Sequence, residues 1–143
     1  MPESFSEPET AILHETAFEF GPHVWIGFHS GTCALFMPYD HVGTLPQGEA
    51  AQAQFKLLEK LKEADLLPQC KVGSGGKNVG YVAHGTGTDY MYSVLNVPLA
   101  CTWEIYGDRT VSSDDCYRMF NPPTQKELQV QPCHFSPLAH ECL

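Results

Sequence analysis

The run Val97–Tyr106 (VPLACTWEIY) places a carboxylate inside an otherwise apolar stretch, which constrains the fold more than any other feature of this sequence. A short apolar run bounded by Asn96 and Gly107 predicts a buried strand. Burying Glu104 in such a strand costs free energy unless a neighbouring group uses the carboxylate. This run alone leaves two interpretations open: Glu104 is paired structurally, or it acts as a general base.

The composition predicts one globular domain and excludes several classes of partner. At 143 residues, with 43% hydrophobic and 17% charged residues, the chain can bury a core of its own. A net charge of −9 with only 8 Lys and Arg predicts no nucleic-acid partner, because phosphate binding needs clustered cations. No apolar run reaches the roughly 18 residues that span a membrane, so no membrane association is expected. The first ten residues, MPESFSEPET, do not have the pattern of a signal peptide.

The hydrophobic periodicity predicts an alternation of helices and strands. A helix is expected to begin at Ser6 as its N-cap, with Glu9 three residues later, and to end at Gly21. Its apolar face would carry Ile12, Leu13, Thr16, Ala17 and Phe20. The other expected elements are a strand at 23–28 with His29 at its end, a helix at 49–66, a short helix at 86–95 and a buried strand at 98–104.

The remaining segments are rich in glycine and proline and are expected to be irregular. These are a loop at 30–48, a flexible loop at 70–80, an irregular stretch at 108–123, and one or two helical turns at 125–131. The six cysteines form no Cys-x-x-Cys pair and no zinc-finger spacing, so the sequence leaves their disulfide state open.

Apolar strands that alternate with helices predict an α/β fold with a mixed, largely parallel sheet flanked by helices. In open sheets of this class, ligands bind beyond the carboxyl ends of the strands. His29 and Glu104 each end an expected strand. We therefore expect chemistry at this edge of the sheet.

Taken singly, each of the candidate residues also has an ordinary structural explanation. A lone histidine such as His29 is more often a satisfied polar residue than a metal ligand, and Tyr81 could be an ordinary loop tyrosine. His84 and Asp89 flank the start of the short helix, where an acidic residue is favoured by the helix dipole. The sequence has no serine nucleophile elbow, phosphate loop, dinucleotide fingerprint or His-Glu-x-x-His motif.

The combination of segments is more specific than its parts. The segments SFSEPET (4–10), FHSGTCALFMPYDH (28–41), YVAHGTGTDY (81–90) and VPLACTWEIYGD (97–108) occur in one consistent order. Together they resemble the zinc carboxypeptidases of the carboxypeptidase A type. The resemblance covers about residues 5–121, so residues 1–143 are expected to form a partial domain of this family with an irregular tail at 122–143.

The resemblance implies a role for each matching position. His29 would be the third zinc ligand, and Glu104 the general base that takes a proton from the zinc-bound water. Tyr81 would be the mobile tyrosine that closes over the C-terminal end of the substrate. Ser30, next to the ligand, would contact substrate, and Thr88 would lie at the base of the specificity pocket. A threonine there favours neither a basic nor an acidic C-terminal residue.

The departure from the family is as informative as the match. The family takes its first two zinc ligands from an upstream His-x-x-Glu motif and binds the substrate carboxylate with an Asn-Arg pair, and neither occurs in this sequence. The chain is therefore expected to correspond to the C-terminal half of a zinc-dependent exopeptidase that releases C-terminal amino acids from peptides or proteins, with an N-terminal half as its partner. The isolated chain would then be inactive. A catalytically inactive relative that binds peptides, and an unrelated small α/β domain, are the alternatives.

Overall fold

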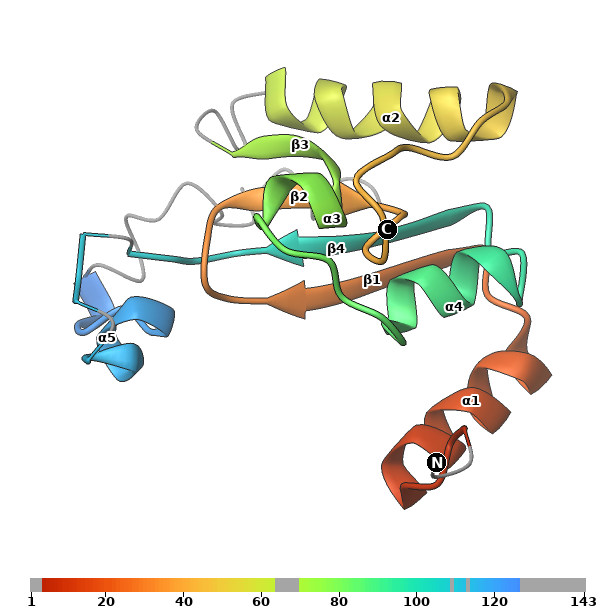
Figure 1. Cartoon of the computed structure of the whole chain (residues 1–143), viewed down its shortest axis with the longest axis horizontal. Coiled ribbons are helices and arrows are strands. Elements are labelled where there is room, and N and C mark those ends of the chain that lie inside the picture. Colours follow the sequence, from red (N-terminus) through yellow and green to blue (C-terminus); the bar gives the residue numbers. More distant parts are fainter. Residues whose placement is uncertain (1–3, 64–69, 109, 113, 127–143) are drawn as a thin grey trace.

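A four-stranded mixed sheet forms the centre of the protein in the computed structural model, which describes residues 4–63, 70–108, 110–112 and 114–126 (Figure 1). The strands are β1 (Val24–His29), β2 (Ala34–Met37), β3 (Lys71–Ser74) and β4 (Leu99–Glu104), in the order β1-β4-β2-β3. β1 pairs with β4 and β2 with β3 in parallel, whereas β2 and β4 are antiparallel. The expected α/β fold with a mixed, largely parallel sheet flanked by helices is confirmed.

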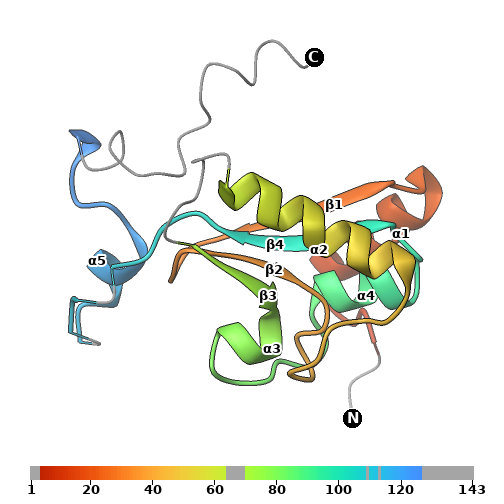
Figure 2. The same cartoon turned by 90° about the horizontal axis from the view of Figure 1, so that it is seen from above.

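Helices flank the sheet on both faces, as Figures 1 and 2 show. The described helices are α1 (Pro8–Phe20), α2 (Glu49–Leu61), α3 (Gly75–Asn78), α4 (Gly87–Ser93) and α5 (Cys116–Phe120). α2 packs against β2 and β3, while α4 packs against β4 and β1. Among the residues that the structure describes, no helix is long and apolar enough to cross a bilayer.

Two core clusters lie on opposite faces of the sheet. The first joins α2 to β2 and β4 and consists of Leu35, Met37, Ala51, Leu58, Cys70 and Cys101. The second joins α1 and α4 to β4 and consists of Ala17, Met91, Val97 and Ala100. Because successive side chains of a strand point to opposite faces, Ala100 and Cys101 serve different clusters. Alternation along the strands therefore also decides which residues face the α4 side.

The expected loop at 30–48 is wrong where it includes β2, and the expected loop at 70–80 is wrong where it includes β3 and α3. All four residues of β2 are buried, so its short run lacks the alternation that marks an exposed strand. A disulfide between Cys33 and Cys70 joins the residues that immediately precede β2 and β3. Residues 71–74 are therefore regular because they pair with β2, and not because of their local strand propensity.

The glycines that suggested flexibility instead permit a close approach of two loops. A Cβ atom on Gly75 would overlap the Asp40 carboxylate, and one on Gly76 would lie 2.7 Å from the Asp40 carbonyl oxygen. The Gly76 amide donates to the Tyr39 carbonyl at 3.1 Å. These two glycines therefore allow residues 75–76 to pack directly against residues 39–42.

Several helix boundaries differ from the sequence prediction. The N-cap of α1 is Glu7 rather than Ser6, whose hydroxyl instead donates to the Glu7 side chain. Of the expected apolar face of α1, only Ala17 is buried. α5 lies in the stretch expected to be irregular, and residues 125 and 126 are helical. Residues 64–66 of the expected second helix, 127–131 and most of the expected tail lie outside the described residues.

Replacing Thr86 by alanine is expected to lower the free energy of unfolding by about 1 kcal/mol, the usual effect of losing an N-cap. Thr86 is the N-cap of α4, and its hydroxyl accepts from the Asp89 amide at 3.3 Å. Thr86→Ser keeps the oxygen and should stay within a few tenths of a kcal/mol of the wild type, as Ser and Thr are similar caps. Urea unfolding monitored by circular dichroism measures both, and equal losses in the two variants would contradict the cap.

Candidate active site

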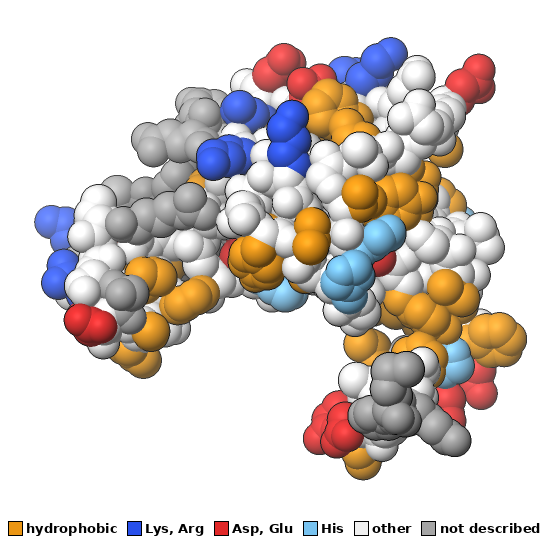
Figure 3. Space-filling model, viewed as in Figure 1, with side chains coloured by type: hydrophobic (Ala, Val, Ile, Leu, Met, Phe, Trp, Pro, Cys, Tyr) orange, Lys and Arg blue, Asp and Glu red, His pale blue; other side chains and the backbone are white. Residues whose placement is uncertain are grey.

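A cavity of about 260 Å³ opens on the α4 side of the sheet. Its walls come from β1, β2 and the segment that follows it, β4, the first turn of α4 and the segment between α3 and α4. The lining residues are Trp25, Gly27, His29, Phe36, Asp40, Val79, Tyr81, Ala83, Thr86, Gly87, Thr88, Thr102 and Glu104. Figure 3 shows the concave side of the molecule between α1 and α5, where hydrophobic side chains gather. Four of the five candidate site residues from the sequence therefore line one cavity.

His29 and Glu104 are neighbours at the carboxyl ends of two parallel strands. They are direct partners in the β1–β4 register, so their side chains leave the same face of the sheet side by side. Glu104 is buried, with 9% of its surface exposed. The arrangement sets a carboxylate beside an imidazole in the wall of the cavity, which suits general acid–base chemistry.

Thr88 lines the same cavity. It is 4% exposed, and its hydroxyl shares a hydrogen bond of 2.7 Å with the Thr102 hydroxyl. Thr102 precedes Glu104 by two residues on β4 and points to the same face. This pair of threonines forms a neutral polar part of the wall.

The two remaining candidates differ in their position. Tyr81 is 67% exposed and lies where the chain enters the cavity wall after α3. A phenol with this exposure can change its rotamer without displacing packed neighbours. Ser30 directly follows His29 and is half-buried, but it is not among the residues that line the cavity.

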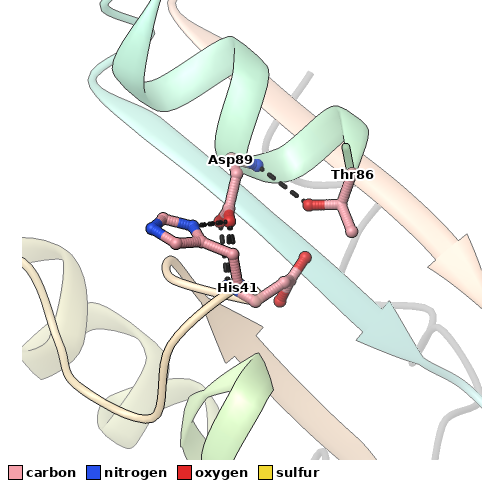
Figure 4. A network of polar contacts seen from close by, with 4 residues as sticks. His41, Thr86 and Asp89 are labelled. Carbon is pink, nitrogen blue, oxygen red and sulfur yellow. Dashed lines mark hydrogen bonds and ion pairs between the residues drawn. The ribbon is translucent and has the colours of Figure 1, made fainter. Parts of the chain in front are cut away.

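The sequence analysis missed the acidic residue Asp40 in the cavity wall and the role of Asp89 behind it. The Asp89 carboxylate accepts from the Asp40 amide at 2.9 Å, from the His41 amide at 3.1 Å and from His41 Nδ1 at 2.5 Å. Figure 4 shows the Asp89 side chain turned toward His41 while its amide meets Thr86. Asp89 therefore ties the segment after β2 to α4, beyond the helix-dipole role expected from the sequence.

The environment of Asp40 disfavours its charged form. Burial raises the pKa of the Asp40 carboxyl above its ordinary value, and the neighbouring Asp89 carboxylate raises it further. A hydrogen bond with the Thr86 side chain and the nearby imidazoles of His29 and His41 lower it in part. A carboxyl group in this position would gain from a cation that enters the cavity.

The residues that the structure describes do not by themselves complete a zinc site. A catalytic zinc has three protein ligands and a water molecule. Within residues 4–63, 70–108, 110–112 and 114–126, no group of three or more His, Cys, Asp and Glu side chains could hold a metal ion. Among the residues of the cavity wall, His29 could serve as one ligand.

Comparison with known protein families gives a match. The model of a family described as zinc carboxypeptidase matches residues 1–131 of the 143 residues. No match is found among the curated proteins. The family match covers every described element of the fold and all the residues that line the cavity.

Proposed function

Because the chain belongs to the zinc carboxypeptidase family, we propose that it forms part of a zinc-dependent exopeptidase that releases C-terminal amino acids from peptides or proteins. The observation that carries this proposal is the meeting of His29, Glu104, Tyr81 and Thr88 in one cavity. These residues come from three separate segments of the sequence. A purely structural role for Glu104 would not require a neighbouring imidazole and an open cavity.

In this proposal the chain's own residues bind the substrate tail and move a proton. Glu104 accepts a proton from the attacking water and delivers it to the leaving amine. Tyr81 closes over the substrate and donates a hydrogen bond to it. Thr88 contacts the side chain of the C-terminal residue, and Ser30, outside the cavity lining, contacts the substrate near His29.

We further propose that His29 is a zinc ligand and that an N-terminal half of the domain supplies the other two. Two surfaces of the chain support a partner of this kind. β1 lies at one edge of the described sheet, and its side chains Val24, Ile26 and Phe28, which alternate with those that line the cavity, are exposed. On α1, Ile12 and Phe20 are 64% and 79% exposed. Burying such apolar surfaces against a further part of the domain would be favourable.

The chain alone is expected to retain well under one zinc ion per molecule after dialysis against trace zinc. One imidazole gives little affinity, because structural and catalytic sites use three or four protein ligands. His29→Ala should remove whatever zinc is retained, whereas His14→Ala, on α1, should not. Metal analysis of the dialysed proteins measures this, and circular dichroism confirms that each variant is folded.

A stoichiometric zinc ion that His29→Ala leaves in place would contradict the assignment of His29. A stoichiometric zinc ion lost in that variant would mean that other residues of this chain, or a second copy, complete the site. Chelator-sensitive hydrolysis by the chain alone would overturn the need for an N-terminal half. If the chain with its partner half binds peptides at the cavity and never hydrolyses them, the alternative of an inactive binding relative replaces the enzyme.

A further inference from the structure

We propose that Gly107 is a positioning residue for the proposed reaction. It lets two chain segments cross at the ends of β1 and β4, and this crossing fixes His29 relative to Glu104. The inference rests on the proposed function, since it concerns the same pair of residues. Gly107 is not among the residues that line the cavity, so it would act through the backbone without touching the substrate.

The order of the strands makes the two segments cross. β1 and β2 follow each other in the sequence, but β4 lies between them in the sheet. His29 of β1 and Ala34 of β2 are both register partners of Glu104, one on each side of it. The connection formed by residues 30–33 therefore passes beyond Glu104 and across the chain that leaves β4, as Figure 1 shows.

At the crossing the two backbones are in direct contact at Gly107. A Cβ atom on Gly107 would overlap the Thr32 amide nitrogen and the Gly31 carbonyl carbon. These are backbone atoms, which cannot turn aside as the end of a flexible side chain can. Gly107 does not have a positive φ, so glycine is needed here for space and not for its conformation. Any other residue would push the connection away from the chain that leaves β4.

Two hydrogen bonds link the crossing to the candidate active site. The Ile105 amide donates to the His29 carbonyl at 2.8 Å, and the Gly31 amide donates to the Tyr106 carbonyl at 2.6 Å. They continue the pairing of β1 with β4 beyond the last residues of both strands. Pairing is lost most readily where an element ends. These bonds and the crossing therefore hold the ends of β1 and β4 in register.

The helix α5 supports the crossing from beyond the strand ends (Figure 1). The Asp108 amide donates to the Met119 carbonyl at 3.0 Å, which ties α5 to the chain that leaves β4. On the other segment, a Cβ atom on Gly31 would lie 2.7 Å from the ring of Phe120. α5 therefore contacts both of the segments that cross, which restricts their movement relative to each other.

The relative position of His29 and Glu104 should affect the rate of the proposed reaction more than substrate binding. A general base must lie about 2.6–3.2 Å from the atom whose proton it takes, and a displacement of about 1 Å can lower the rate about 100-fold. Of the proposed substrate contacts, Tyr81 and Thr88 belong to other segments, and Ser30 alone lies in the connection. A displaced crossing should therefore lower kcat much more than it raises KM.

The first test uses the full chain and requires neither zinc nor turnover. A nuclear Overhauser cross-peak is expected between the His29 ring protons and the Glu104 side-chain protons, since neighbouring strands lie about 4.8 Å apart. Gly107→Ala should lose this cross-peak. The control is Ala53→Gly, an exposed substitution inside α2, which also lowers stability and should keep the cross-peak.

Gly31→Ala tests the same crossing from the other segment if Gly107→Ala does not fold. Gly31 has a φ of +141°, and a side chain there would meet Phe120, so this variant should also lose the cross-peak. The inference is overturned if the wild type lacks the cross-peak, or if the folded glycine variant keeps it. A loss that occurs equally in Ala53→Gly would overturn it too, because the cross-peak would then follow stability alone.

The second test measures hydrolysis by the zinc-loaded chain together with the proposed N-terminal half. Gly107→Ala should lower kcat by about tenfold or more and change KM by less than about threefold. A raised KM with an unchanged kcat would overturn the inference, because Gly107 would then affect substrate binding. If the wild type hydrolyses no peptide in this preparation, the proposed function fails, and the cross-peaks decide whether Gly107 positions His29 and Glu104.

Discussion

Glu104→Gln is expected to lower kcat/KM for release of a C-terminal residue by about 10²- to 10⁴-fold, the range of a lost general base. The amide has the shape of the carboxylate and cannot take a proton from water. Because Glu104 is buried at the end of β4 beside His29, no solvent group can easily replace it. The measurement is hydrolysis by the chain together with the proposed N-terminal half, with zinc content determined for Glu104→Gln and for the wild type.

A control variant and a zinc measurement distinguish loss of the general base from a less specific effect of the substitution. Glu59→Gln removes an exposed carboxylate from α2 and should leave kcat/KM unchanged. The zinc content should be the same in Glu104→Gln and in the wild type, since the base is not proposed as a ligand. If Glu104→Gln keeps more than about a tenth of the wild-type rate, the loss is below the usual contribution of a general base, and Glu104 has a structural role.

The meeting of His29 and Glu104 could be predicted from the sequence. Each residue ends a short apolar run, and parallel strands bring such ends to one edge of the sheet. The register confirms that the two residues are neighbours, although their chemical roles remain proposals. Thr88 and Tyr81 could be assigned to the same region only through the order of the family's segments, because their local sequence is that of a helix start and a loop.

Asp40 could not be found in this way, because its position depends on two strands that the sequence does not mark. The run before it, Ala34–Met37, is too short to distinguish a buried strand from a loop. Lys71–Ser74 contains a glycine and is regular only because it pairs with that run. The Cys33–Cys70 disulfide, one of many pairings that six cysteines allow, joins the two segments. Tertiary contacts alone therefore bring Asp40 to the cavity.

The glycines near residue 75 are a second case in which local sequence does not predict the tertiary contact. A cluster of glycines predicts a flexible loop when only local freedom is considered. In the fold, Gly75 and Gly76 are needed because residues 40–42 pass too close for a Cβ atom. The sequence shows where side chains are absent, and the packing shows that their absence makes room for Asp40.

Asp89→Ala is expected to lower the free energy of unfolding by about 3–5 kcal/mol, which is large for a single polar substitution. The amides of Asp40 and His41 would lose their acceptor, and each unsatisfied donor costs about 1–3 kcal/mol when shielded from water. The carboxylate also lies in the first turn of α4, where the helix dipole favours negative charge by about 0.3–1 kcal/mol. Urea unfolding at pH 7 measures the loss.

Asp115→Ala is the matched control, because Asp115 also accepts a backbone amide, that of Arg118, at the start of the exposed helix α5. It should cost only about 1 kcal/mol, as an N-cap with solvent nearby does. If Asp89→Ala is as stable as the wild type, the Ala83–Asp40 and Gly76–Tyr39 backbone hydrogen bonds suffice to hold residues 39–41 in place.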